Sequence, residues 1–142
     1  MGKKSSRKPK FDPRIVKAHK MYVDAINSNK TDRVMACYDK DAQIMQPDGP
    51  LVKGEKSIRK WVDDYFKAYK THWDKESKLI WVAGDYGFDQ GVDTAHDKPR
   101  DGGPTQVYTV KGLLIYKKQK DGRFLVYRDI WNFNSMPQIC RA

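Results

Sequence analysis

Cysteine and histidine are scarce in this chain of 142 residues, which holds two Cys and three His. Two cysteines are too few for the disulfide framework of a small secreted domain, and the three scattered histidines lack the spacing of metal ligands. No apolar run approaches the ~20 residues that a membrane-spanning helix needs, and the first residues lack the apolar stretch of a secretory signal. We therefore expect no metal cofactor, no membrane span and a reducing, cytoplasmic location.

Acidic residues are absent from the first ten positions, which hold five lysines and arginines. The net charge is +10, so the rest of the chain is only mildly basic. A solvated basic run attracts polyanions and anionic lipid, with an affinity that falls as salt rises. Gly2 and Ser6 also fit the loose N-myristoylation pattern, for which a basic run is a usual second anchor. The sequence predicts a disordered basic tail over residues 1–10, with weak polyanion or membrane-surface contact.

Apolar residues, at 39% of the chain, suffice for one core, and the length is that of one domain. Asp12 as cap and Pro13 as first helical residue open a predicted helix, and Thr31 caps a short second one. Six apolar residues between Ile58 and Tyr69 recur at helical spacing and predict a third helix. Residues 42–46 and 51–52 predict a small hairpin between the second and third helices.

Residues that favour β-strands dominate the second half of the chain. Residues 78–92, 105–117 and 123–132 predict antiparallel strands, Asp121 and Gly122 a tight turn, and residues 93–104 a mobile polar connection. Helices first and strands later imply an α+β fold with helices on one face of a curved sheet. We expect one domain over residues 11–134, followed by a short tail over residues 135–142.

Four short segments carry a family resemblance: YVDAIN at residues 22–27, CYDKDA at 37–42, the helix entry at 54–58, and RDIWN at 128–132. In this order they resemble the nuclear transport factor 2-like superfamily, and within it the SnoaL-like and ketosteroid isomerase-like proteins. The resemblance implies a cone, or cystatin-like roll, in which a strongly bent antiparallel sheet wraps around a central pocket closed by about three helices. It also implies a homodimer formed through the sheet face.

The resemblance places three groups of the isomerase mechanism, of which this chain keeps one. Tyr22 stands where the oxyanion-binding tyrosine would stand, but Gln46 occupies the position of the proton-abstracting aspartate. The second oxyanion donor would fall around residues 110–116, and the whole stretch 107–118 contains no Asp or Glu. Because glutamine cannot act as a base near neutral pH, steroid-type isomerisation by that mechanism is disfavoured.

Asp129 is the predicted acid/base residue, because the family alignment points it into the cone from the last strand. Burial in an aromatic pocket would raise the pKa of Asp129 towards the range useful for proton transfer. Tyr22 is its predicted catalytic partner. The alternative is that Asp129 accepts hydrogen bonds from an internal partner and only orders the pocket, and this alternative stays open. The same alternation of side chains selects ligand-binding candidates, for which a plain core role is the alternative: Tyr86, Phe88, Gln90, Tyr127 and Trp131. Gln46, which the resemblance places in the pocket, is a further ligand-binding candidate.

Two functions of different classes fit such a pocket. The first is a small-molecule enzyme without metal or redox cofactor, an isomerase, cyclase or dehydratase acting on a hydrophobic substrate. In it Asp129 moves a proton while Tyr22 and Gln46 hold a polar atom of the substrate. The second is a non-catalytic ligand-binding or homodimerisation module, which the missing isomerase groups favour. Both hypotheses stay open on the sequence.

Overall fold

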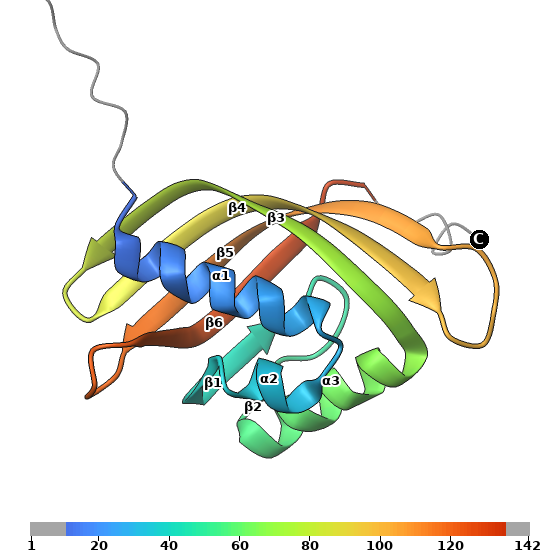
Figure 1. Ribbon diagram of the computed structural model, residues 1–142, viewed down its shortest axis with the longest axis horizontal. Helices are drawn as coiled ribbons and strands as arrows, with labels where there is room; N and C mark the ends of the chain where they lie inside the picture. Colours follow the sequence, from blue (N-terminus) through green and yellow to red (C-terminus); the bar gives the residue numbers. More distant parts are fainter. Residues whose placement is uncertain (1–10, 136–142) are drawn as a thin grey trace, which may run out of the picture.

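The structure is a computed structural model and describes residues 11–135 (Figure 1). The predictions for residues 1–10, and for the C-terminal tail from residue 136 on, lie outside the described residues. None of the helices within the described range has the length and apolarity needed to cross a bilayer. The elements in chain order are α1 (Pro13–Asn27), α2 (Thr31–Met35), β1 (Tyr38–Met45), β2 (Val52–Lys53), α3 (Glu55–Ala68), β3 (Tyr69–Ala83), β4 (Tyr86–Pro99), β5 (Gln106–Lys118) and β6 (Phe124–Phe133).

The strands form one bent sheet in the order β2-β1-β6-β5-β4-β3. Every neighbouring pair is antiparallel except β1 and β6, which run parallel. Figure 1 shows α1 lying across the sheet, with α2 and α3 beyond it beside the short strands β1 and β2. The predicted α+β class, a strongly bent sheet with helices on one side, is confirmed.

The two longer helices form for the reasons that the sequence predicts. The side chain of Asp12 accepts the backbone N–H of Arg14 at 2.9 Å, and Pro13 takes the first helical position of α1. Helix α3 buries Ile58, Val62 and Phe66, one residue per turn, and is strongly amphipathic. Both helices therefore turn an apolar stripe towards the inner face of the sheet.

Strands β3 and β4 are longer than predicted. Strand β3 begins at Tyr69, and β4 continues to Pro99. Residues 93–97 pair with strands on both sides, and residues 98–99 pair with β3, so this segment does not form a mobile connection. Their polar composition misled the prediction, because the inward side chains of this part of β4 include the buried acids Asp93 and Asp97. The tight turn predicted at Asp121 and Gly122 does join β5 to β6, and Gly122 adopts the positive φ of 88° that favours glycine.

A β-bulge on β6 changes which side chains face inwards. The register with β5 passes from Val126 to Arg128 and leaves Tyr127 without a cross-strand partner. An extra residue in one strand shifts the alternation that follows it. Phe124 and Val126 are thus buried before the bulge, and Asp129 is buried after it.

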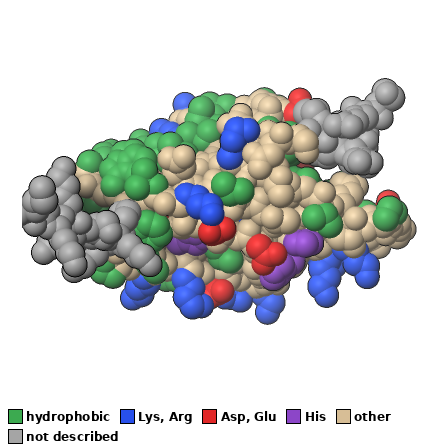
Figure 2. Space-filling view, turned by 90° about the horizontal axis from the view of Figure 1, so that it is seen from above, with side chains coloured by type: hydrophobic (Ala, Val, Ile, Leu, Met, Phe, Trp, Pro, Cys, Tyr) green, Lys and Arg blue, Asp and Glu red, His purple; other side chains and the backbone are tan. Residues whose placement is uncertain are grey.

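The outer face of the sheet carries exposed apolar side chains. Leu79, Trp81 and Val92 are 42%, 40% and 39% exposed, and the ring of Phe88 stacks on Trp81 with centroids 4.8 Å apart. Figure 2 looks down on the arch of β3 and β4 and shows hydrophobic side chains gathered towards the end where β3 stops and β4 starts. A group of exposed apolar side chains such as this one is typical of an interaction surface.

Candidate functional site

A cavity of about 190 Å³ lies between the inner face of the sheet and the helices. Neighbouring aromatic rings contact one another around it: the centroids of Trp61 and Trp131 are 6.0 Å apart, and those of Trp73 and Tyr108 are 5.9 Å apart. An apolar cavity of about 150 Å³ holds a benzene ring, so this one accepts a flat ligand built on a single ring. The aromatic lining consists of Tyr22, Tyr38, Trp61, Tyr65, Phe66, Trp73, Tyr108, Trp131 and Phe133.

Two glycines keep the floor of the cavity free of side chains. Gly91 on β4 and Gly112 on β5 are cross-strand partners, and both line the cavity. A Cβ on Gly91 would lie 2.7 Å from the backbone oxygen of Glu76, and one on Gly112 would lie 3.0 Å from that of Ile130. The backbone of the neighbouring strands therefore excludes larger residues here, and the missing side chains leave space for a ligand.

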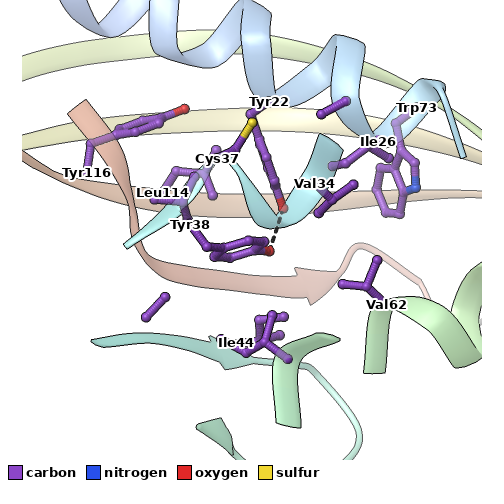
Figure 3. Close-up of a cluster of buried hydrophobic side chains, with 14 of the residues drawn as sticks. Tyr22, Ile26, Val34, Cys37, Tyr38, Ile44, Val62, Trp73, Leu114 and Tyr116 are labelled. Carbon is purple, nitrogen blue, oxygen red and sulfur yellow. Dashed lines mark hydrogen bonds between the residues drawn. The ribbon is translucent and has the colours of Figure 1, made fainter. Parts of the chain in front are cut away.

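Asp129 forms the polar centre of the cavity wall with Tyr22 and Tyr38. The Tyr22 hydroxyl donates to Asp129 Oδ2 at 2.5 Å, the Tyr38 hydroxyl donates to the same oxygen at 3.0 Å, and the two hydroxyl oxygens are 2.9 Å apart. Figure 3 shows the two tyrosine side chains converging from α1 and from the start of β1. All three residues are less than 9% exposed. Both hydrogen bonds from the described residues thus reach Oδ2 of Asp129. Its Oδ1 remains available to a ligand.

The surroundings of Asp129 favour its neutral form. Burial raises its pKa, opposed by the charge of Lys75 and by the two tyrosine hydrogen bonds. Burial and the nearby carboxyl group raise the pKa of Tyr22 and of Tyr38 well above the usual value, so both remain neutral donors.

A buried ion pair lies beside this group. Lys75 Nζ contacts Asp93 Oδ2 at 2.8 Å, and the two side chains are 10% and 12% exposed. The pair forms because Lys75 and Asp93 are direct cross-strand partners on β3 and β4. The ammonium group also lies 4.7 Å from the ring centre of Trp73 and 5.8 Å from that of Tyr22.

A histidine and a third carboxylate meet at the side of the cavity near α1. His19 Nδ1 lies 2.7 Å from Asp89 Oδ2 and also 2.7 Å from the hydroxyl oxygen of Ser77. Asp89 is buried, and both it and His19 line the cavity. His19 precedes Tyr22 by one helical turn, so the two side chains share a face of α1. Within residues 11–135 no group of three or more His, Cys, Asp or Glu side chains is arranged to hold a metal ion.

The structure brings four of the predicted site residues to the cavity. Tyr22 and Asp129 are in direct contact, and Gln46 and Trp131 line the same space. The side chain of Gln46 already has partners, because its amide nitrogen donates to Pro50 O at 3.0 Å and its oxygen accepts the indole N–H of Trp61 at 3.3 Å. Gln46 therefore shapes the wall beside α3.

The inward orientation expected of the other four residues is wrong. On β4 the odd-numbered residues, including Asp89 and Asp93, face the cavity, so Tyr86, Phe88 and Gln90 face outwards. The alternation of side chains was predicted with the opposite sense on this strand, and its aromatic side chains lie on the outer face. Tyr127 occupies the bulge of β6 and does not line the cavity; its ring lies 5.8 Å from that of Tyr86.

The sequence prediction missed five polar residues of the cavity. Tyr38 lies within the CYDKDA segment that carries the family resemblance, and this position could have indicated it as a site residue. Lys75 and Asp93 lie in stretches where no strand was expected, so alternation could not be applied to them. The remaining two are His19, on the face of the first helix that also carries Tyr22, and Asp89, which alternates with the residues expected to face inwards.

Residues 19–127 match the SnoaL-like domain family. The chain belongs to this family. Three similar solved structures confirm the superfamily resemblance at the level of the fold. A ketosteroid isomerase-like protein from Erwinia carotovora atroseptica has a TM-score of 0.79 and 19% identity, and the match covers 87% of this chain and 95% of that chain. A nuclear transport factor 2-like superfamily protein from Salmonella enterica has a TM-score of 0.78 and 14% identity, with 92% of this chain and 95% of that chain covered. A candidate scytalone dehydratase from Novosphingobium aromaticivorans has a TM-score of 0.77 and 13% identity, with 87% of this chain and 83% of that chain covered. No curated protein sequence matches the chain.

Proposed function

We propose that this SnoaL-like protein is an acid/base enzyme, an isomerase, cyclase or dehydratase that needs no cofactor and acts on a small, flat, hydrophobic carbonyl compound. The observation that carries the proposal is the buried Asp129, whose Oδ2 is held by Tyr22 and Tyr38 while Oδ1 is left to a ligand. An aromatic cavity with a few placed polar groups is the usual composition of a small-molecule site.

The proposed reaction begins with removal of a proton from the carbon next to the carbonyl group. Asp129 Oδ1 takes the proton, and the C–H electron pair moves towards the carbonyl oxygen to form an enolate. The raised pKa of Asp129 brings its basicity closer to what this transfer needs. Return of the proton to another carbon completes an isomerisation; its transfer to a β-hydroxyl group that leaves as water completes a dehydration. Tyr22 and Tyr38 position the carboxyl group, and Gln46 and Trp131 contact the substrate body.

Two single-ring ketones test the proposal. The aldol of benzaldehyde and acetone reports dehydration, and allyl phenyl ketone reports isomerisation, because each gives a conjugated enone with strong ultraviolet absorption. We expect the wild-type protein to form at least one of these enones faster than buffer does. Thermal stabilisation by the ketones without any product would instead assign the cavity to the non-catalytic binding module. Dehydration is included because a candidate scytalone dehydratase shares the fold.

We also propose that the chain forms a homodimer through the outer face of its sheet. The exposed Leu79, Trp81 and Val92 lie on this face, with Phe88 stacked beside Trp81. Contact between two such faces would remove these side chains from water, which is the main favourable term in association.

Replacing Trp81 by glutamate is expected to convert the dimer into a monomer, because it would place two like charges in an apolar interface. Sedimentation velocity at micromolar protein concentration measures the change. Val16→Glu is the matched control, since Val16 is 45% exposed but lies on α1, away from the sheet face. A monomeric wild-type protein, or a dimeric Trp81→Glu variant, would contradict the proposed interface.

A further inference from the structure

Lys75 is a cation in the cavity wall that the proposed proton transfer does not use. It is the only lysine or arginine among the described residues that line the cavity. A buried ion pair contributes little to stability unless other hydrogen bonds support it. The pair with Asp93 therefore calls for an explanation other than folding.

Hydrogen-bond accounting leaves Lys75 with donors to spare. An ammonium group carries three N–H donors, and among the described residues Asp93 accepts one of them. The other donors of the wall are engaged in hydrogen bonds within the protein: Tyr22 and Tyr38 donate to Asp129, Tyr108 to Asp97, Trp73 to Tyr65, and Trp61 to Gln46. Trp131 and His19 can add a neutral donor, but neither carries a fixed charge.

Lys75 also lies close to the reacting carboxyl group. The Tyr22 ring connects the two, because Lys75 Nζ faces the ring and the hydroxyl at its far end donates to Asp129. The positive charge of Lys75 lowers the pKa of Asp129 and so opposes the rise that burial causes. A substrate whose acidic carbon faces Asp129 Oδ1 can thus direct its oxygen towards the ammonium group.

We propose that Lys75 binds the carbonyl oxygen of the substrate and stabilises the negative charge that forms on it when Asp129 removes the neighbouring proton. The inference rests on the proposed function and narrows the substrates to flat ketones or aldehydes whose carbonyl oxygen becomes an oxyanion. As the C–H bond breaks, its electron pair forms the C=C bond, and the carbonyl π pair moves to the oxygen facing Lys75. Asp93 holds Lys75 in place for this contact. Lys75 thus supplies the oxyanion contact for which residues 107–118 offer no acid.

The ionisation of bound para-nitrophenol tests this role without any turnover. The phenolate is a stable mimic of the oxyanion, and it absorbs at a longer wavelength than the phenol. At one near-neutral pH, we expect the ratio of phenolate to phenol to be higher for the dye bound to the wild-type protein than for the free dye. Lys75→Met should lower the ratio for the bound dye about tenfold, the equivalent of one pKa unit.

Three further variants make the result decisive. Lys78→Met is the matched control, because Lys78 lies on the same strand but is 51% exposed and pairs with Glu76; it should behave as wild type. Lys75→Arg should restore part of the phenolate signal. The double variant Lys75→Met with Asp93→Asn removes both charges of the buried pair and should show the same low ratio if the single variant does not fold.

Equal phenolate ratios in the wild-type protein and the neutral-pair variant, or no binding of the dye to the wild type, would overturn the assignment of Lys75. This outcome is separate from the fate of the proposed function. Enone formation with no dye response would retain the enzyme and remove Lys75 from its mechanism. A dye response with no enone formation would retain the oxyanion site and remove the proposed catalysis.

Discussion

Asp129→Asn is expected to lower turnover at least about a hundredfold while leaving the fold intact. A single positioned acid/base group typically contributes about 10² to 10⁴ in rate, and an amide cannot take the proton. The amide has nearly the shape of the carboxyl group and keeps an oxygen to accept from Tyr22 and Tyr38. Initial rates of enone formation measure the effect. Asp85→Asn, at an exposed acid in the β3–β4 turn, is the control and should keep the wild-type rate.

The same substitution is expected to stabilise the protein at neutral pH. Because burial raises the pKa of Asp129 in the folded state, the folded protein binds this proton more tightly than the unfolded chain does. The stability from this proton is fully present below the unfolded pKa of about 4 and is lost as the pH rises through the folded value. The amide does not titrate, so the variant avoids this loss.

Thermal unfolding followed by circular dichroism checks the sign. The melting temperature of Asp129→Asn should exceed that of the wild type near pH 7, and the difference should shrink as the pH falls below the unfolded pKa. A variant that melts below the wild type at neutral pH would show that Asp129 is stabilised as a carboxylate, and the acid/base role would lose its support.

The inward orientation of Asp129 could be predicted from the family resemblance and the alternation of its strand, but that of Tyr127 could not. Simple alternation groups Tyr127, Asp129 and Trp131 on one face, whereas the bulge separates Tyr127 from the other two. A bulge of this kind depends on how two strands pair, and pairing is a tertiary property. The family resemblance therefore gave the right orientation for Asp129 and Trp131 and the wrong one for Tyr127.

Strand β4 shows a second limit of pattern-based prediction. Apolar side chains usually mark the buried face, and by this rule Tyr86 and Phe88 belong inside. Here they lie on the outer face, which we propose to be an interface, while the inner face carries Asp89 and Asp93. Each acid is tolerated because a partner from another element meets it, and the sequence does not show that Lys75 and Asp93 share a register position.

Asp97→Asn is expected to destabilise the protein by roughly 2–4 kcal/mol, although the chemical change is the same as at position 129. Asp97 is 3% exposed and accepts three side-chain hydroxyls, from Tyr65 at 2.5 Å, Thr71 at 2.5 Å and Tyr108 at 2.7 Å. Both of its oxygens are thus in use, whereas the described residues bond only one oxygen of Asp129. An amide nitrogen cannot accept a hydroxyl proton, and hydrogen bonds to a charged acceptor are worth about 1.5–3 kcal/mol each.

Urea denaturation near pH 7 measures this loss, with Tyr108→Phe as the comparison. Tyr108→Phe removes one donor and leaves the carboxylate two others, so it should cost less than Asp97→Asn. Tyr65 and Tyr108 form part of the cavity wall, so a loosened Asp97 should also weaken binding of para-nitrophenol. If Asp97→Asn and Asp129→Asn shift stability in the same direction, then the number of donors does not separate the two carboxyl groups. If the shifts are opposite, Asp97 supports the wall and Asp129 is the group poised to exchange a proton with a ligand.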